Sequence, residues 1–234
     1  LSGIKGDSLL INLCKPENFT PILAIIGVFI IMMSKSNKKK NTANILLGFT
    51  VLMFGMSTMS SSVEPLKDVP EFTNILIMFE NPILGVLAGM VLTAIIQSSS
   101  ASVGILQALS ATGAITFGSA IPIILGQNIG TCITVVLSAI GTSKNAKRAA
   151  AVHLYFNVIG TVLFLLLFYI VNAFVHFSFL NDAVTPVNIA VVHTLFNLIT
   201  TAVFLPFTNV LEKLAKWTIK DGDGTDMFSV LDEK

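Results

Sequence analysis

The sequence predicts an all-α fold, a polytopic membrane protein, from its composition and from the length of its apolar segments. Hydrophobic residues make up 53% of the chain and charged residues 12%, and the mean hydropathy is +0.83. Soluble domains carry about 25% charged residues, whereas long uncharged apolar segments are typical of transmembrane helices. A soluble fold would have to bury several wholly apolar helices in a chain of 234 residues, whose core is too small for them.

The apolar segments alternate with polar stretches along the whole chain. They cover residues 20–33, 43–60, 83–96, 101–112, 118–140, 149–177 and 188–210. The polar stretches between them are Ser34–Asn41, Glu64–Phe72, Gly141–Arg148 and Ser178–Pro186, and the chain becomes polar again from Glu212. This alternation predicts helices that cross the membrane in turn.

Basic residues gather in three polar stretches, which the positive-inside rule places in the cytoplasm. The basic residues are Lys35, Lys38, Lys39 and Lys40, then Lys144, Lys147 and Arg148, then Lys213, Lys216 and Lys220. Stretch 178–186 has no Lys or Arg and is expected outside. The sequence therefore predicts a multi-pass protein of the plasma membrane with a cytoplasmic C-terminus.

Residues 82–112 predict a re-entrant helical hairpin. For Lys144–Arg148 to lie inside, this region must contribute either no crossing or two. Its two arms would be about 22 and 18 Å long as helices, too short for a hydrocarbon core of about 30 Å. We therefore expect Gln97–Ser100 at the hairpin tip, within the membrane. Irregular backbone at that depth needs burial in protein or a polar cavity.

A short repeat links two later segments. Residues 151–164 (AVHLYFNVIGTVLF) and 191–204 (VVHTLFNLITTAVF) share the pattern His-x-x-Phe-Asn-x-Ile-x-Thr. The predicted helices cross in opposite directions, so the pattern favours one unit of an inverted-repeat transporter.

Polar residues are costly in a membrane and gather here in a few places. Residues 126–134 (GQNIGTCIT) offer neutral oxygens that suit a monovalent cation such as Na⁺, since a divalent ion draws carboxylates. Helix N-termini in the same region would suit an anion. Gly126 and Gly130 permit either close helix packing or a broken helix, and small polar residues can also serve only to pack helices.

Other classes of protein fit less well. Ser98–Ser100 with His153 could suggest a serine hydrolase, but the sequence has no Gly-x-Ser-x-Gly elbow, so we expect no catalytic residues and no enzyme. The histidines lack a metal-binding spacing, and no basic surface predicts a nucleic-acid partner. Cys14 and Cys132 do not form a disulfide framework.

Three segments together resemble the sodium-dependent phosphate cotransporter family with the Gln-Ser-Ser-Ser signature. They are residues 93–115 (TAIIQSSSASVGILQALSATGAI), 122–134 (PIILGQNIGTCIT) and 149–160 (AAAVHLYFNVIG). Members have two inverted repeats, each with such a hairpin. The resemblance covers about residues 44–211 and implies the C-terminal half of the membrane domain. The facing repeat would then be a missing half or a second copy of this chain.

The resemblance implies domains and site residues. The domains are 1–42 (N-terminal helix and Lys-rich loop), 43–211 (transporter repeat with hairpin 82–112) and 212–234 (cytoplasmic tail toward a missing PhoU-like domain). Phosphate would bind Gln97, Ser98, Ser99 and Ser100. Sodium, the coupling ion, would bind Gln97, Ser99, Asn128 and Thr131, to which oxygen chemistry adds Gln127 and Thr134. The supporting residues are Ser102, His153, Asn157 and Asn197.

The expected function is a sodium-coupled phosphate symporter that works by alternating access and needs no cofactor beyond the ion. Gln127 replaces a small residue of the family pattern, and Cys132 replaces a threonine. These departures leave open a symporter of another small solute. A non-transporting membrane scaffold or sensor also stays open. The opening residues, LSGIKGDS, suggest a piece of a longer protein.

Overall fold

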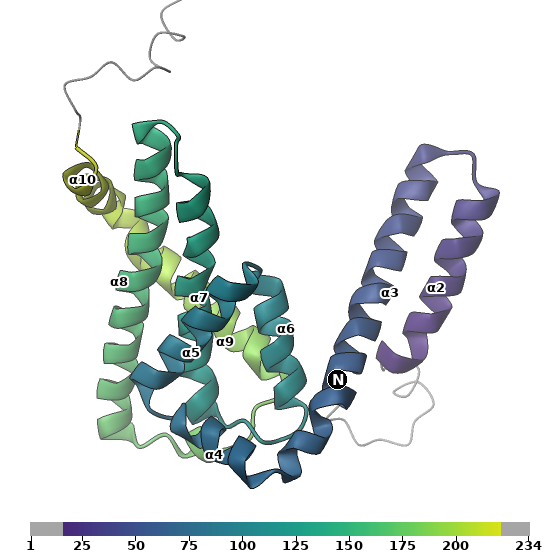
Figure 1. Ribbon diagram of the computed structural model, residues 1–234, viewed down its shortest axis with the longest axis horizontal. Helices are drawn as coiled ribbons and strands as arrows, with labels where there is room; N and C mark the ends of the chain where they lie inside the picture. Colours follow the sequence, from purple (N-terminus) through teal and green to yellow (C-terminus); the bar gives the residue numbers. More distant parts are fainter. Residues whose placement is uncertain (1–15, 221–234) are drawn as a thin grey trace, which may run out of the picture. The chain divides into compact units, whose positions relative to one another are not determined.

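The computed structural model describes residues 16–220 and is helical almost throughout (Figure 1). The helices are α2 (Pro16–Met33), α3 (Asn37–Val63), α4 (Pro70–Met78), α5 (Pro82–Ile96), α6 (Ser99–Ser110), α7 (Phe117–Ser138), α8 (Lys144–Val175), α9 (Pro186–Phe204) and α10 (Thr208–Thr218). Short 3₁₀ turns cover Glu64–Asp68, Ser178–Asn181 and Leu205–Phe207. Within the described residues the only β pairing is an isolated bridge between Thr116 and Ala183, so the all-α prediction is confirmed.

Several helices have the length and composition of membrane spans. Among residues 16–220, four qualify: Asn37–Val63, Phe117–Ser138, Lys144–Val175 and the continuous stretch Pro186–Thr218. Helices α4 and α5, bent by 106°, qualify together as a fifth. The polytopic membrane prediction is therefore confirmed.

The chain divides into two compact units, one ending at Lys67 and one beginning at Asp68. The expected division at residues 42 and 43 falls inside α3, which begins at Asn37. Residues 1–15 and 221–234, to which the outer parts of the expected N-terminal and C-terminal domains belong, lie outside the described residues.

The first unit is a pair of adjacent helices, α2 and α3. Phe19 and Phe49 stack across the pair with ring centroids 6.2 Å apart. The Thr50 hydroxyl donates to the Thr20 carbonyl at 3.4 Å and to Leu46 in its own helix at 3.0 Å. Three lysines, Lys38 to Lys40, fall in the first turn of α3 rather than in a loop, because lysine is a good helix former.

The second unit is built around α7, which packs against α5, α6, α8 and α9. Every residue from Ser119 to Asn128 is buried, because neighbours surround this half of the helix. The apolar core beside it includes Ile115, Ile124, Ile189 and Phe196, all fully buried.

Helices α5 and α7 pack unusually closely and run parallel. A Cβ atom at Gly89 would lie 2.0 Å from the Ile123 carbonyl oxygen, and one at Gly126 would lie 2.0 Å from the Val86 carbonyl oxygen. Small residues at such contacts let membrane helices approach to backbone distance. The sequence left open whether Gly126 breaks its helix, and α7 is continuous there.

The repeated motif brings α8 and α9 together at equivalent positions. Gly160 faces Thr200, and these are the same position of the two copies: a Cβ atom on Gly160 would lie 2.5 Å from the Thr200 methyl group. Phe156 contacts Phe204, and reciprocally Phe164 contacts Phe196, at centroid distances of 5.4 and 5.5 Å. The repeat therefore has a direct packing role, because the two copies form a local pseudo-twofold pair.

Two helices were not expected from the sequence. Helix α4 begins at Pro70, within a stretch interpreted as polar loop, because proline favours the first turn of a helix. Helix α10 spans the boundary placed at residue 212, because Leu211 and Ala215 bury a stripe that outweighs the polar residues between them.

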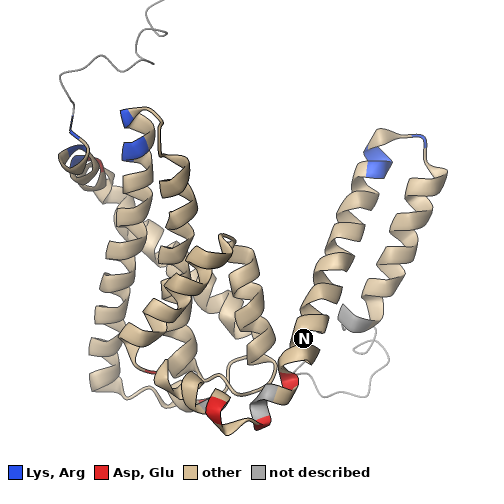
Figure 2. Ribbon diagram, in the orientation of Figure 1, with Lys and Arg blue, Asp and Glu red and all other residues tan. Residues whose placement is uncertain are grey.

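Charges of opposite sign lie at opposite ends of the second unit (Figure 2). The basic residues at the start of α8 and on α10 share one end, with Glu212 among them. Acidic residues lie at the other end, where Glu80 accepts a hydrogen bond from Thr116 at 3.2 Å beside the start of α7. The long axis of the unit therefore carries the charge asymmetry typical of a protein oriented across a membrane.

Candidate functional site

The hairpin between α5 and α6 turns at two residues, Gln97 and Ser98. Gln97 is left-handed, with φ 57° and ψ 24°, and its N–H donates to the Thr93 carbonyl at 2.8 Å to end α5. Ser98 is extended, and its hydroxyl accepts from the Ala101 N–H at 3.3 Å to begin α6. The arms have 15 and 12 residues. The structure therefore places the helix break at the Gln-Ser-Ser-Ser segment, as the sequence predicts.

The tip carries polar groups that the fold leaves accessible. The side chains of Gln97 and Ser100 are exposed, and those of Ser98 and Ser99 are half-buried. The hydroxyls of Ser98 and Ser100 are 3.3 Å apart. Since the first N–H groups of a helix have no partner inside it, the start of α6 offers donors. The last carbonyls of α5 offer acceptors beside them, so the tip can meet charges of either sign.

Below the tip, three buried side chains link three helices. The hydroxyls of Thr93 on α5 and Ser102 on α6 are 2.7 Å apart. The Gln127 Nε2 group on α7 donates to the Ser102 hydroxyl at 2.9 Å and to the Ser102 carbonyl at 3.0 Å. This cluster, Thr93–Ser102–Gln127, fixes the hairpin against α7 because each buried polar group would be costly without its partner.

One atom of this cluster has no protein partner. Gln127 is 1% exposed, yet its Oε1 accepts no hydrogen bond from the described residues. Buried carbonyl oxygens are almost always satisfied. The orphaned oxygen is therefore a ready ligand for a small cation.

The other predicted oxygen ligands lie along α7. The Thr131 hydroxyl donates to the Gln127 carbonyl and the Thr134 hydroxyl donates to the Thr131 carbonyl, both at 2.9 Å. Asn128 Oδ1 accepts from Asn197 Nδ2 on α9 at 3.4 Å. Because both threonine hydroxyls donate their hydrogen to a backbone carbonyl, the lone pairs of the two hydroxyl oxygens remain available to accept a hydrogen bond or to coordinate a cation.

The motif residues of α8 and α9 make the same local bond. Asn157 Nδ2 donates to the His153 carbonyl at 3.0 Å, and Asn197 Nδ2 donates to the His193 carbonyl at 2.8 Å. Asn157 is buried, and Nδ1 of His153 is buried with no partner among the described residues. The Asn157 amide therefore bonds within its own helix, and the supporting role of His153 and Asn157 stays a prediction.

Cys132, the second departure from the family pattern, faces α8. Its thiol lies 3.7 Å from the carbonyl oxygens of both Asn128 and His153. It is 1% exposed. Cys132 therefore belongs to the contact between helices α7 and α8.

The predicted residues thus form groups rather than one closed cage. Ser102 with Gln127 forms one, and Asn128 with Asn197 forms another. No hydrogen bond among residues 16–220 joins the tip residues Gln97, Ser99 and Ser100 to α7. The helix register still relates the tip to α7, because Gly130 packs on Thr93 and Gln97 follows Thr93 by one helical turn.

Sequence reasoning missed Thr93. It belongs to the network that supports the tip and is fully buried. A signal was present in the spacing, since Gly85, Gly89 and Thr93 recur every four residues and share one face of α5.

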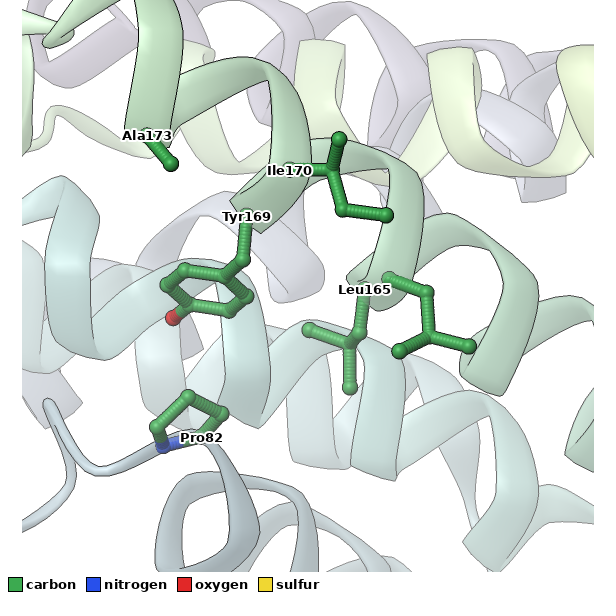
Figure 3. A pocket seen from close by; sticks show the side chains of 6 residues that line it. Pro82, Leu165, Tyr169, Ile170 and Ala173 are labelled. Atoms are coloured by element: carbon green, nitrogen blue, oxygen red, sulfur yellow. The ribbon is translucent and has the colours of Figure 1, made fainter.

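An open apolar groove lies away from these residues, between the start of α5 and the later part of α8 (Figure 3). Its volume is about 410 Å³, and it is lined by Pro82, Leu165, Leu166, Tyr169, Ile170 and Ala173. The Tyr169 hydroxyl is the polar side-chain group in that lining. The groove suits a lipid chain better than an ion.

The fold and the polar centre define a class: a helical membrane protein whose broken hairpin is fixed against a spanning helix. The chain belongs to the Na⁺/Pi-cotransporter family, whose model matches residues 7–61 and 65–187. The family is one of transporters rather than enzymes, and sodium is its coupled ion.

Individual relatives match over different lengths. The uncharacterized protein YqeW of Bacillus subtilis is 34% identical over 203 residues, which is 81% of this chain and 61% of that protein. Human sodium-dependent phosphate transport protein 2B is 40% identical over 100 residues, 40% of this chain and 14% of that protein. The rat 2A protein is 37% identical over 94 residues, 38% and 15% of the two chains. No solved structure matches this chain.

Proposed function

We propose that this chain is the second repeat of a sodium-coupled inorganic phosphate symporter. The observation that carries the proposal is the junction at Gln97–Ser100. There the C-terminal end of α5 meets the N-terminal end of α6 among uncharged polar side chains. Membership of the Na⁺/Pi-cotransporter family supports it.

Phosphate binds at the tip, through Gln97, Ser98, Ser99 and Ser100. The N–H groups at the start of α6 and the serine hydroxyls supply donors, and the helix dipole favours an anion there. No Lys or Arg lies between Asn81 and Ser143, so bound sodium ions supply the positive charge. Binding of the anion therefore depends on sodium.

Sodium binds between the tip and α7. The orphaned Oε1 of Gln127 supports this assignment, and Asn128, Thr131 and Thr134 add oxygens along the same helix. Gln97 and Ser99 close the site from the hairpin. Neutral oxygens of this kind select a weakly held monovalent cation over a divalent one.

The protein lies in the plasma membrane. The basic end of the second unit and the C-terminus face the cytoplasm. The charge asymmetry of the unit supports this orientation. Hairpin 82–112 then enters from outside as a re-entrant element within repeat 43–211. An inverted facing repeat, from a missing half or a second copy, completes the site, and alternating access exposes it to each side in turn.

The test is uptake of ³²P-phosphate into liposomes that contain the protein expressed from its complete reading frame. Uptake should require an inward Na⁺ gradient and vanish when K⁺ replaces Na⁺. Uptake driven equally by both gradients would overturn the sodium coupling. Competition by other anions distinguishes a symporter of another solute, and folded protein that neither binds nor transports phosphate would indicate a scaffold or sensor.

A further inference from the structure

Helix α10 is attached to the start of α8 along one side. Leu211 and Ala215 are buried, and the Tyr155 hydroxyl lies 2.8 Å from the Thr218 hydroxyl. At the end of α10, Arg148 donates from Nη2 and Nε to the Ile219 carbonyl at 2.9 and 3.1 Å. The helix therefore has a fixed position at the basic end of the second unit.

The apolar face of α10 is wider than α8 covers. Val210, Leu214 and Trp217 recur at helical spacing beside the buried stripe. Trp217 is 73% exposed and Val210 is 51% exposed. Leu205 and Phe207, in the 3₁₀ turn between α9 and α10, are also exposed and continue this apolar surface toward α9.

A third stripe of α10 is basic. Lys213 and Lys216 lie three residues apart on this helix, Lys220 follows two residues after its end at Thr218, and all three are exposed. Lys216 forms an ion pair with Glu212. Lys213 and Lys220 therefore contribute more to the net positive charge of this surface. The basic residues at the start of α8 lie at the same end of the unit (Figure 2).

We propose that α10 lies in the membrane surface and binds anionic phospholipid headgroups. Val210, Leu214 and Trp217 enter the boundary between headgroups and acyl chains, where tryptophan is favoured. Lys213, Lys216 and Lys220 contact the phosphate and headgroup anions above it. A helix with an apolar face, a lysine face and a flanking tryptophan has the pattern of a surface-bound membrane helix. This inference does not depend on the substrate of the transporter.

Trp217 provides the test, because it is the one tryptophan in the sequence. The full chain is reconstituted in vesicles that contain, at equal mole fraction, brominated phosphatidylglycerol or brominated phosphatidylcholine. Both lipids should quench Trp217 fluorescence, and phosphatidylglycerol should be enriched around it at low salt, by about fivefold for each lysine that contacts a headgroup. Molar salt should remove the difference.

A lysine substitution separates charge from burial. The triple variant Lys213→Gln/Lys216→Gln/Lys220→Gln should lose the phosphatidylglycerol preference but keep quenching by phosphatidylcholine. The matched control, Lys38→Gln/Lys39→Gln/Lys40→Gln on α3, should keep the preference. Three aspartates follow in the sequence, Asp221, Asp223 and Asp226. The lipid preference of the unsubstituted protein therefore measures the attraction of the lysines for anionic lipid after any repulsion by these aspartates.

Two outcomes would overturn the proposal. Equal quenching by the two lipids at low salt would show that α10 does not bind anionic headgroups preferentially. Absence of quenching by either lipid would mean that solvent or another protein segment covers Trp217. The salt dependence of the unsubstituted chain decides the question even where a variant fails to fold.

Discussion

Two neighbouring regions of the hairpin are built in opposite ways. One is the face of α5 that packs on α7, and the other is the tip that follows the end of α5. Along the contact, glycines bring the backbones together, and Thr93, the last residue of that face, is fully buried and hydrogen-bonded. One turn later, Gln97 is exposed and left-handed, and its side chain has no hydrogen bond within the described residues.

The difference distinguishes residues that hold the hairpin in place from residues that are accessible to a ligand. The packed face leaves no space for even a methyl group at Gly89 or Gly126. At the tip the Gln97 side chain makes no hydrogen bond within the described residues, and the Gln97 backbone is in the left-handed region. Strain of this kind is tolerated where the surrounding structure enforces it. The comparison indicates that the α5–α7 contact is rigid, and it supports the proposal that phosphate binds at the tip.

The largest effect is expected at the contact. In Gly126→Ala or Gly89→Ala, the new methyl group would overlap a backbone carbonyl oxygen 2.0 Å away. Forcing the helices apart should cost about 3 kcal/mol or more and greatly lower the yield of folded protein. Size-exclusion chromatography and circular dichroism in detergent measure this. A normal yield of stable protein would contradict the close packing.

Gln127 tests whether the supporting cluster also reaches the ion. Gln127→Leu removes the orphaned oxygen while keeping side-chain volume. The sodium concentration for half-maximal uptake should rise about tenfold, equivalent to about 1.4 kcal/mol. Gln107→Leu is the matched control, since Gln107 bonds the Pro186 carbonyl elsewhere. An unchanged sodium dependence in Gln127→Leu would limit Gln127 to packing.

The hydroxyl pair of Thr93 and Ser102 should contribute less. Ser102→Ala and Thr93→Val should each lower the unfolding free energy by about 1 kcal/mol, the usual range for hydrogen bonds inside membranes. The double variant should cost less than the sum, because both changes remove the same bond. Unfolding in SDS, followed by circular dichroism, gives the values, and strict additivity would argue against the bond.

The smallest effect serves as the control for the glycine variants. A Cβ atom on Gly48 in α3 would meet nothing within 4 Å. Gly48→Ala should leave folding intact and raise the unfolding free energy by up to about 1 kcal/mol, since alanine restricts the unfolded chain. Destabilisation by Gly48→Ala would show that glycine substitutions harm this protein for reasons other than overlap.

Much of the fold could be predicted from sequence because its signals are local. The interruption of an apolar segment by Gln97–Ser100 fixed the helix break, and the lengths of its flanks gave the arms of 15 and 12 residues. Composition alone gave the membrane class. Helix α4 was not predicted because charged residues flank it, and α10 was not predicted because Glu212, Lys213 and Lys216 interrupt its apolar residues in the sequence.

The candidate site was harder to predict because it depends on which helices meet. Gln127 and Ser102 are 25 residues apart, and no local pattern indicates that they share a hydrogen bond. Thr93 looked like an ordinary helical residue. The roles of Gln97, Ser99, Thr131 and Thr134 in binding remain predictions, since they depend on ions and phosphate.

The most direct measurement of the central claim compares the two left-handed residues of the described chain that are not glycine, Gln97 and His176, with φ of 57° and 52°. Gln97→Gly and His176→Gly each keep a backbone that glycine adopts without strain and remove only the side chain. In Na⁺-driven ³²P-phosphate uptake, Gln97→Gly should lose transport while remaining folded, and His176→Gly should transport normally. Full transport by Gln97→Gly would contradict the account, because the tip side chain would then carry no part of the site.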